Sequence, residues 1–175
     1  MHSGKTTVAT LLVRDHGYIR LRFADAIKNM LRVLGLDDEH LEGSLKETPT
    51  DLLCGLTPRK AMQTLGTEWG RKQIHPGFWV RATETQCNTL LDCGHRVVID
   101  DVRFGNEAAM VRKAGGTLLR VVRYDDVLIS ELTHETEKHW SSIEVDGIIC
   151  NRFDISNLTC QIQKIFEITI CQDVV

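Results

Sequence analysis

The pattern of apolar positions switches between a strand period and a helix period along the chain. Residues 18–24 alternate polar and apolar side chains, and residues 97–99 form a β-branched run typical of a parallel strand buried on both faces. The predicted strands are 18–24, 95–104, 117–124 and 145–150, and the predicted helices are 6–16, 25–35, 57–74, 78–92, 106–116 and 155–168. Because strands and helices follow one another, we expect an α/β fold with a mainly parallel sheet and crossover helices.

Two segments depart from this alternation. Residues 36–56 are polar and predict short helices and loops, while residues 125–144 are charged and irregular. The helix that opens at Thr57-Pro58 contains Gly66 and Gly70, which predict a break.

Composition narrows the class of protein. The 175 residues suggest one domain, with 42% hydrophobic and 26% charged residues. A net charge of −3 disfavours a general nucleic-acid binder. No apolar run approaches the roughly 20 residues that span a bilayer, and no signal segment opens the chain. The six cysteines form no C-x-x-C pair, which favours reduced thiols in a cytoplasm.

The first candidate site is Ser3-Gly4-Lys5-Thr6-Thr7, which matches the end of a phosphate-binding loop. In such a loop a helix N-terminus surrounds the phosphates with positive partial charge. Lys5 would reach the β- and γ-phosphates, Thr6 would ligate Mg²⁺, and Thr7 could donate to an α-phosphate. The alternative is a chance S-G-K-T at the start of a helix.

The second candidate site is TPRKAMQTLGTEWG. Arg59 and Lys60 near a helix start suit an anion such as a monophosphate, and Gln63 could bond a base edge. Gly66 and Thr67 could allow close approach of a nucleotide, and Trp69 and Trp79 offer stacking surfaces. The alternative is a solvated basic face and two core tryptophans.

The third candidate site is VVIDDVRFGNEA, at the carboxyl end of the 95–104 strand, where open α/β folds bind ligands. One of Asp100 and Asp101 can point into the site. We favour Asp101, with Arg103 holding a phosphate bidentately and Glu107 pairing with Arg103. The alternative is an ion network that caps the next helix.

Further charged groups lie beyond this block. Arg120 and Arg123 flank the end of the 117–124 strand, and the segment after them could close as a lid over the donor. Ordinary strand-end arginines beside a solvated loop are an equally good interpretation, and His134 has no assigned role.

Taken together, these blocks resemble the deoxynucleoside monophosphate kinases of tailed bacteriophages, over nearly the whole chain. The resemblance rests on SGKTTVA, FADAIK, TPRKAMQTLGTEWGR, FWV, VVIDDVRFGNEA, HETE (134–137) and VDGIICN. The run QTLGTEWGR and the D-V-R-F-x-N-E block are the most specific.

The resemblance implies a P-loop kinase fold of three α/β/α layers, and transfer of the ATP γ-phosphate to a deoxynucleoside 5′-monophosphate, with ATP and Mg²⁺ as cofactors. The helical part of residues 25–92 would bind the acceptor, and residues 125–144 would be the lid. By matching motif, the nucleotide-binding residues would be Ser3, Gly4, Lys5, Thr6 and Thr7. The acceptor side would comprise Arg59, Lys60, Gln63, Gly66, Thr67 and Trp79, completed by Asp101, Arg103 and Glu107. Of these, Lys5, Arg59, Asp101 and Arg103 would be catalytic.

The chain departs from the family pattern at its start. The first loop glycine would fall two positions before Met1, and the central strand that should precede the loop is missing. A misassigned start and a non-catalytic remnant are the alternatives, and we expect the chain as given to be a poor kinase of low stability.

Another small-molecule P-loop kinase, resembling dephospho-coenzyme A kinase, is the second enzyme interpretation. The accepted bases and the oligomeric state stay open, with a homodimer among the alternatives.

Overall fold

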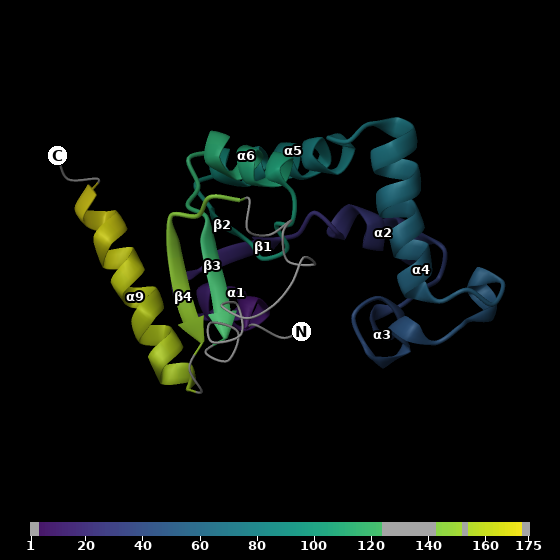
Figure 1. The fold of residues 1–175 in the computed structure, drawn as a ribbon, viewed down its shortest axis with the longest axis horizontal. Coiled ribbons are helices and arrows are strands. Elements are labelled where there is room, and N and C mark those ends of the chain that lie inside the picture. The colour runs from purple at the N-terminus through teal and green to yellow at the C-terminus, as the bar shows by residue number, and fades with distance from the viewer. Residues whose placement is uncertain (1–3, 124–142, 152–153, 173–175) are drawn as a thin grey trace, which may run out of the picture. The chain divides into compact units, whose positions relative to one another are not determined.

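The structure is a computed structural model that describes residues 4–123, 143–151 and 154–172. It divides into two compact units, Met1–Arg20 with His95–Val175, and Leu21–Gly94 (Figure 1). The predicted helical part, residues 25–92, falls within the second unit. That the whole chain acts as one domain stays a prediction.

The first unit is built around α1 (Lys5–His16), which confirms the first predicted helix. Val8, Ala9, Leu11 and Leu12 are its buried residues, and their spacing of three and four places them on one face. The helix ends at His16, and Gly17, in a left-handed conformation with φ 67°, is its C-cap.

Four short strands occupy the predicted positions in two separate pairs. β1 (Tyr18–Leu21) pairs with β2 (Arg96–Ile99), and β3 (Leu119–Arg123) pairs with β4 (Gly147–Asn151). The second pair is parallel, with Val121 opposite Ile149. In Figure 1 these two strands run side by side, with α9 (Ile155–Gln172) beside β4. The described part of the chain therefore confirms an α/β class with parallel pairing.

One apolar core joins both strand pairs to α1. The buried residues of this core are Val8, Leu11, Leu12, Ile149, Leu158 and Ile162. Tyr18 and Val98 pack against it from the first pair, and Leu119 and Val121 pack against it from the second. The face of α1 therefore contacts both pairs, although no strand of one pair bonds to the other within the described residues.

The prediction that residues 97–99 are buried on both faces is wrong for this structure. Val97, Val98 and Ile99 all keep part of their surface exposed. The physical reason is that β2 has β1 as its one strand partner in the described part of the chain, so its other edge is not covered by a strand.

The second unit is helical. Its elements are α2 (Asp25–Val33), α3 (Asp38–Leu41), η1 (Ser44–Glu47), η2 (Asp51–Leu53), α4 (Pro58–Gln63), η3 (Thr64–Ile74) and α5 (Phe78–Asp92). Leu31, Leu36 and Leu41 form a core, against which residues of η2, α4 and η3 pack. The short, irregular elements of 36–56 and the proline in the first turn of α4 are as predicted.

The predicted break at Gly66 and Gly70 is instead a change of helix type. The chain stays helical through η3, where it widens into a π-helix, and the N–H of His75 donates to the carbonyl of Gly70 five residues earlier, at 3.0 Å. The indole of Trp79 donates to the carbonyl of Gly66 at 2.8 Å. A Cβ at position 70 would lie 2.4 Å from Trp79 Nε1, so glycine makes room for the indole ring.

We expect Gly70→Ala to destabilise the protein by roughly 1–3 kcal/mol, because the added methyl group forces the buried Trp79 ring to shift. Urea unfolding, followed by tryptophan fluorescence and circular dichroism, measures the change. Gly105→Ala is the matched control. Gly105 opens α6 (Gly105–Lys113), and a Cβ there meets nothing within 4 Å. Equal midpoints for the two variants would contradict the packing role of Gly70.

Candidate active site

The start of α1 has the features of an anion-binding helix end. Gly4 is the N-cap residue in a left-handed conformation, with φ 96°, and its carbonyl accepts from the N–H of Val8 at 3.0 Å. No acidic residue stands in the first turn of α1. Lys5, Thr6 and Thr7 are exposed there. This end of the helix therefore carries positive partial charge that negative side chains of its own turn do not neutralise. Ser3 lies outside the described residues.

The position of Gly4 also depends on a neighbour that sequence reasoning missed. A Cβ at Gly4 would lie 2.4 Å from Asn151 Nδ2, so only glycine fits beside this side chain. Asn151 is the last residue of β4. In the sequence, Asn151 is the last residue of the VDGIICN block. That block contributed to the family resemblance, but it assigned no role to Asn151. The amide of Asn151 therefore lies beside the start of α1.

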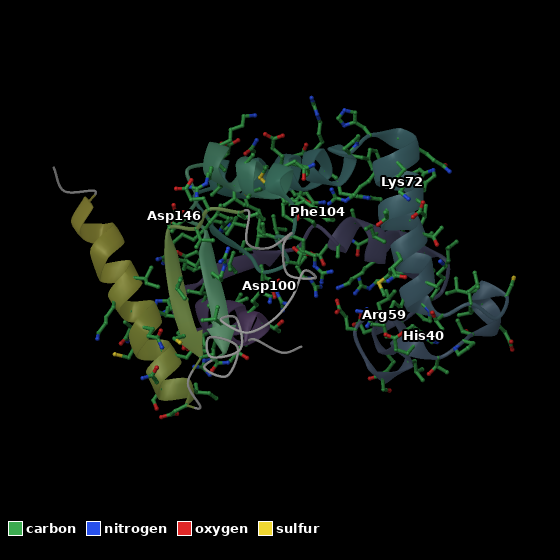
Figure 2. The ribbon with its side chains drawn as sticks, viewed as in Figure 1. His40, Arg59, Lys72, Asp100, Phe104 and Asp146 are labelled. Carbon is green, nitrogen blue, oxygen red and sulfur yellow. The ribbon has the colours of Figure 1, made fainter. Side chains whose placement is uncertain are left out.

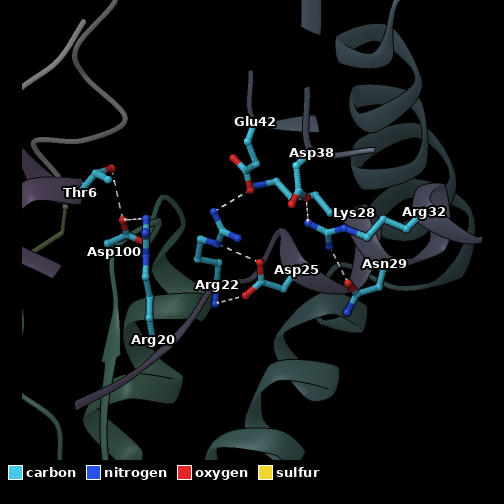
Figure 3. A network of polar contacts seen from close by, with 10 residues as sticks. All are labelled: Thr6, Arg20, Arg22, Asp25, Lys28, Asn29, Arg32, Asp38, Glu42 and Asp100. Atoms are coloured by element: carbon cyan, nitrogen blue, oxygen red, sulfur yellow. Dashed lines mark hydrogen bonds and ion pairs between the residues drawn. The ribbon is translucent and has the colours of Figure 1, made fainter. Parts of the chain in front are cut away.

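A carboxylate lies next to the predicted metal ligand Thr6. The Thr6 hydroxyl donates to Asp100 Oδ2 at 3.4 Å, and Arg20 Nε donates to Asp100 Oδ1 at 3.2 Å (Figure 3). Arg20 Nη2 also pairs with Asp100 Oδ2, which makes the contact bidentate. The Asp100 side chain is 6% exposed, so this residue is held in a defined position. Figure 2 labels it on the first unit.

Asp100, rather than the favoured Asp101, is the acidic residue that the structure brings to Thr6. Neighbours on an extended chain tend to face opposite sides, and Asp100 is the one whose carboxylate contacts Thr6. Asp101 is half-buried, and its predicted catalytic role stays a prediction. Thr6 and Asp100 supply hydroxyl and carboxylate oxygens, the donors that Mg²⁺ takes in proteins. No group of three or more His, Cys, Asp or Glu that could hold a metal occurs elsewhere among the described residues.

Glu107 has a structural role that the sequence offered only as the alternative. Its side chain is buried, and its Oε2 accepts from the N–H of Arg103 at 2.6 Å and from that of Phe104 at 3.0 Å. These bonds cap the N-terminus of α6. Glu107 thus contacts the backbone of Arg103, and Arg103 itself is exposed. Their roles towards substrate stay predictions.

The acceptor-side residues divide into an exposed set and an internal set. The exposed residues, all on α4 and η3, are Arg59, Lys60, Gln63 and Thr67. Arg59 pairs with Glu47 of η1 and is labelled in Figure 2. Gly66, by contrast, offers its carbonyl to Trp79 rather than an open approach.

The stacking role predicted for Trp79 is corrected. Trp79 is 3% exposed, and its ring lies 6.0 Å from that of Trp69 and 4.8 Å from that of Phe78. A base cannot stack on a ring whose faces are covered by protein. Trp79 is therefore a core residue in this structure, as the alternative interpretation had it.

The lid prediction cannot be placed on the structure, because residues 124–142, including His134, lie outside the described residues. Arg120 belongs to β3, and its Nη2 donates to the carbonyl of Ile143 at 3.0 Å. Nothing is described for the side chain of Arg123. Within the described ranges, no helix is long and apolar enough to cross a lipid bilayer.

The arrangement defines a class: an α/β protein in which a glycine-capped helix start and a hydroxyl–carboxylate pair lie at the ends of strands. Comparison with known proteins is more specific. A family model described as deoxynucleotide monophosphate kinase matches residues 45–162. A protein of Acanthamoeba polyphaga mimivirus, assigned by name to the deoxynucleotide monophosphate kinases, is 35% identical over 179 residues, which cover 91% of this chain and 89% of the relative.

A second relative is the deoxynucleoside-5′-monophosphate kinase of Escherichia phage T5. It is 27% identical over 121 residues, which cover 66% of this chain and 48% of that protein. The chain therefore belongs to the deoxynucleotide monophosphate kinase family. Viral relatives also agree with the bacteriophage resemblance drawn from the motifs.

We expect Glu107→Ala to destabilise the protein by roughly 1–3 kcal/mol, because two backbone N–H groups lose their acceptor. Thermal and urea unfolding measure this. Glu68→Ala is the control, since Glu68 forms an exposed pair with Lys72 four residues on, and such pairs contribute well under about 1 kcal/mol. A Glu107→Ala protein with unchanged stability and weakened nucleotide binding would show instead that Glu107 is a ligand.

Proposed function

We propose that this protein transfers the γ-phosphate of ATP to a deoxynucleoside 5′-monophosphate, forming ADP and the deoxynucleoside diphosphate. Family membership gives the class of acceptor. The observation that carries the assignment of the donor site is the contact of Thr6 with Asp100 beside the glycine-capped start of α1.

The reaction needs little acid–base chemistry. A phosphate oxygen of the acceptor is already anionic, so it can attack the γ-phosphorus in line while the bond to the β–γ bridging oxygen breaks and ADP leaves. Positioning and charge neutralisation therefore supply most of the catalysis. Lys5 at the start of α1 would hold the β- and γ-phosphates, and Arg103 and Arg59 would add positive charge to the transferred group and the acceptor.

This proposal assigns the metal-binding role to Asp100 rather than to Asp101. Thr6 and Asp100 would hold Mg²⁺ beside the donor phosphates, where the ion neutralises their charge. Arg20 would keep the Asp100 carboxylate aimed at Thr6, because its guanidinium contacts both carboxylate oxygens. Arg20 is thus a positioning residue rather than a catalytic one.

We further propose that the two strand pairs are flanks of one parallel sheet of the P-loop kinase type, joined by a strand between β2 and β3. Two contacts support this placement. Thr6 reaches Asp100, directly after β2, and Gly4 lies against Asn151 at the end of β4, so the loop end meets both pairs. The core under α1 likewise takes residues from both pairs.

The proposed sheet is tested by lengthening the chain at its N-terminus. The chain as given is compared with one lengthened by the in-frame codons upstream of Met1. If these codons encode an apolar run and a glycine two positions before Met1, the longer protein should show sharper unfolding and faster transfer. Robust ATP-dependent transfer by the 175-residue chain, with no gain on extension, would contradict the proposal.

The activity itself is tested with a panel of acceptors and ATP, scored by coupled ADP release and by chromatography of the products. We expect deoxynucleoside monophosphates such as dGMP or dTMP to be phosphorylated and dephospho-coenzyme A to be left unchanged. Phosphorylation of dephospho-coenzyme A alone would overturn the assignment in favour of the other small-molecule kinase class.

Lys5→Ala should abolish transfer, and Asp100→Asn should lower kcat by about 10²-fold or more, the usual scale for a group that stabilises transition-state charge. Asp101→Asn is the matched comparison, and we expect it to be the milder of the two. A larger loss for Asp101→Asn would favour Asp101 as the carboxylate of the metal site instead.

A further inference from the structure

Cationic side chains gather in the second unit where α2, η1 and α4 meet. Lys28 comes from α2, Lys46 from η1 and Arg59 from α4, and η1 packs against both α3 and α4. Lys28 is the most constrained of them, because the residue is only 6% exposed. An ammonium group buried this deeply is tolerated only with negative charge beside it.

The negative charge comes from Glu42, and one oxygen of its carboxylate contacts two cations. Glu42 Oε1 lies 2.5 Å from Lys28 Nζ and 2.7 Å from Arg22 Nη1 (Figure 3). Burial alone would raise the pKa of Glu42, but the hydrogen bond from Lys28 and the charges of Lys28 and Arg22 hold it below its ordinary value. A single oxygen held by an ammonium and a guanidinium group is also how proteins hold a phosphate oxygen.

Lys46 differs from its neighbours. Within the described part of the chain it forms no hydrogen bond or ion pair, whereas Lys28 pairs with Glu42 and Arg59 pairs with Glu47. Burial, followed by repulsion from Lys28 and Arg59, lowers the pKa of Lys46, and the attraction of Glu42 and Glu47 does not fully offset this. The charged form of Lys46 is therefore disfavoured in the folded protein relative to the unfolded chain.

We propose that Lys46, with Lys28 and Arg59, binds the 5′-phosphate of the acceptor deoxynucleoside monophosphate. A phosphate monoester carries a charge of about −1.5 to −2 at pH 7 and three acceptor oxygens, which suits three converging cations. Glu42 and Glu47 hold Lys28 and Arg59 in place until the phosphate supplies the charge that Lys46 lacks. This inference deepens the proposed function and rests on it for the identity of the ligand.

The test is equilibrium binding to the full chain, measured by calorimetry with three probes: dGMP, deoxyguanosine and inorganic phosphate. For Lys46→Gln we expect affinity for dGMP to fall by about tenfold or more, with affinity for deoxyguanosine unchanged. The unfolding midpoint of the free variant should not fall, because the substitution removes a repelled charge. This combination separates a binding role from a structural one.

Lys72→Gln is the matched control. Lys72 is an exposed lysine of the same unit, paired with Glu68, and its loss should leave dGMP binding and stability unchanged. Glu42→Gln is a second variant with the opposite expectation for stability: it should destabilise the free protein, since Lys28 loses its counter-charge.

Several outcomes would overturn the proposal. These are undiminished dGMP binding by Lys46→Gln, an equal loss for dGMP and deoxyguanosine, and inorganic phosphate binding as tightly as dGMP. Turnover is scored separately. Binding of dGMP that depends on Lys46, in a protein that transfers no phosphate, would support this site while refuting the kinase function.

Discussion

The packing of α1 is the constraint on which the first unit depends. Val8, Leu11 and Leu12 bury one helix face against residues of both strand pairs, and burial of aliphatic side chains of this size contributes roughly 1.5–3 kcal/mol each. Because the same helix begins at Gly4, the packing that forms the core also places the start of α1 against Asp100 and Asn151. The fold and the proposed donor site thus depend on the same helix position.

The second unit is organised by charge as well as by its leucine core. The carboxylate of Glu42 pairs with both Lys28 and Arg22. Arg22 also pairs with Asp25, at 2.8 Å. Such shared pairs are rigid, because moving one member leaves others unpaired. Lys46 lies outside this network and its side chain forms no ion pair among the described residues, which favours a ligand as its partner.

The helices and strands could be predicted because their signals are local. Periodicity, a proline after Thr57 and glycine stops each act within a few residues, and the elements formed where these signals stand. The exceptions have long-range causes. Along the π-helical η3, the indole of Trp79 lies against Gly70 and donates to the carbonyl of Gly66, and no feature of the run from Thr64 to Ile74 indicates that contact.

The sequence motifs of the candidate site could be predicted, but the contacts between their side chains could not. Thr6 and Asp100 are 94 residues apart, so the choice between neighbouring aspartates depends on strand parity and helix placement that the sequence does not display. Within the most specific motifs, some residues support the backbone and others have exposed side chains. In TPRKAMQTLGTEWGR and the D-V-R-F-x-N-E block, Gly70 and Glu107 maintain the backbone, whereas Arg59 and Arg103 are exposed, as their proposed contacts with substrate require. Because these motifs combine backbone roles with exposed side chains, a match to them does not by itself reveal which residues touch the substrate.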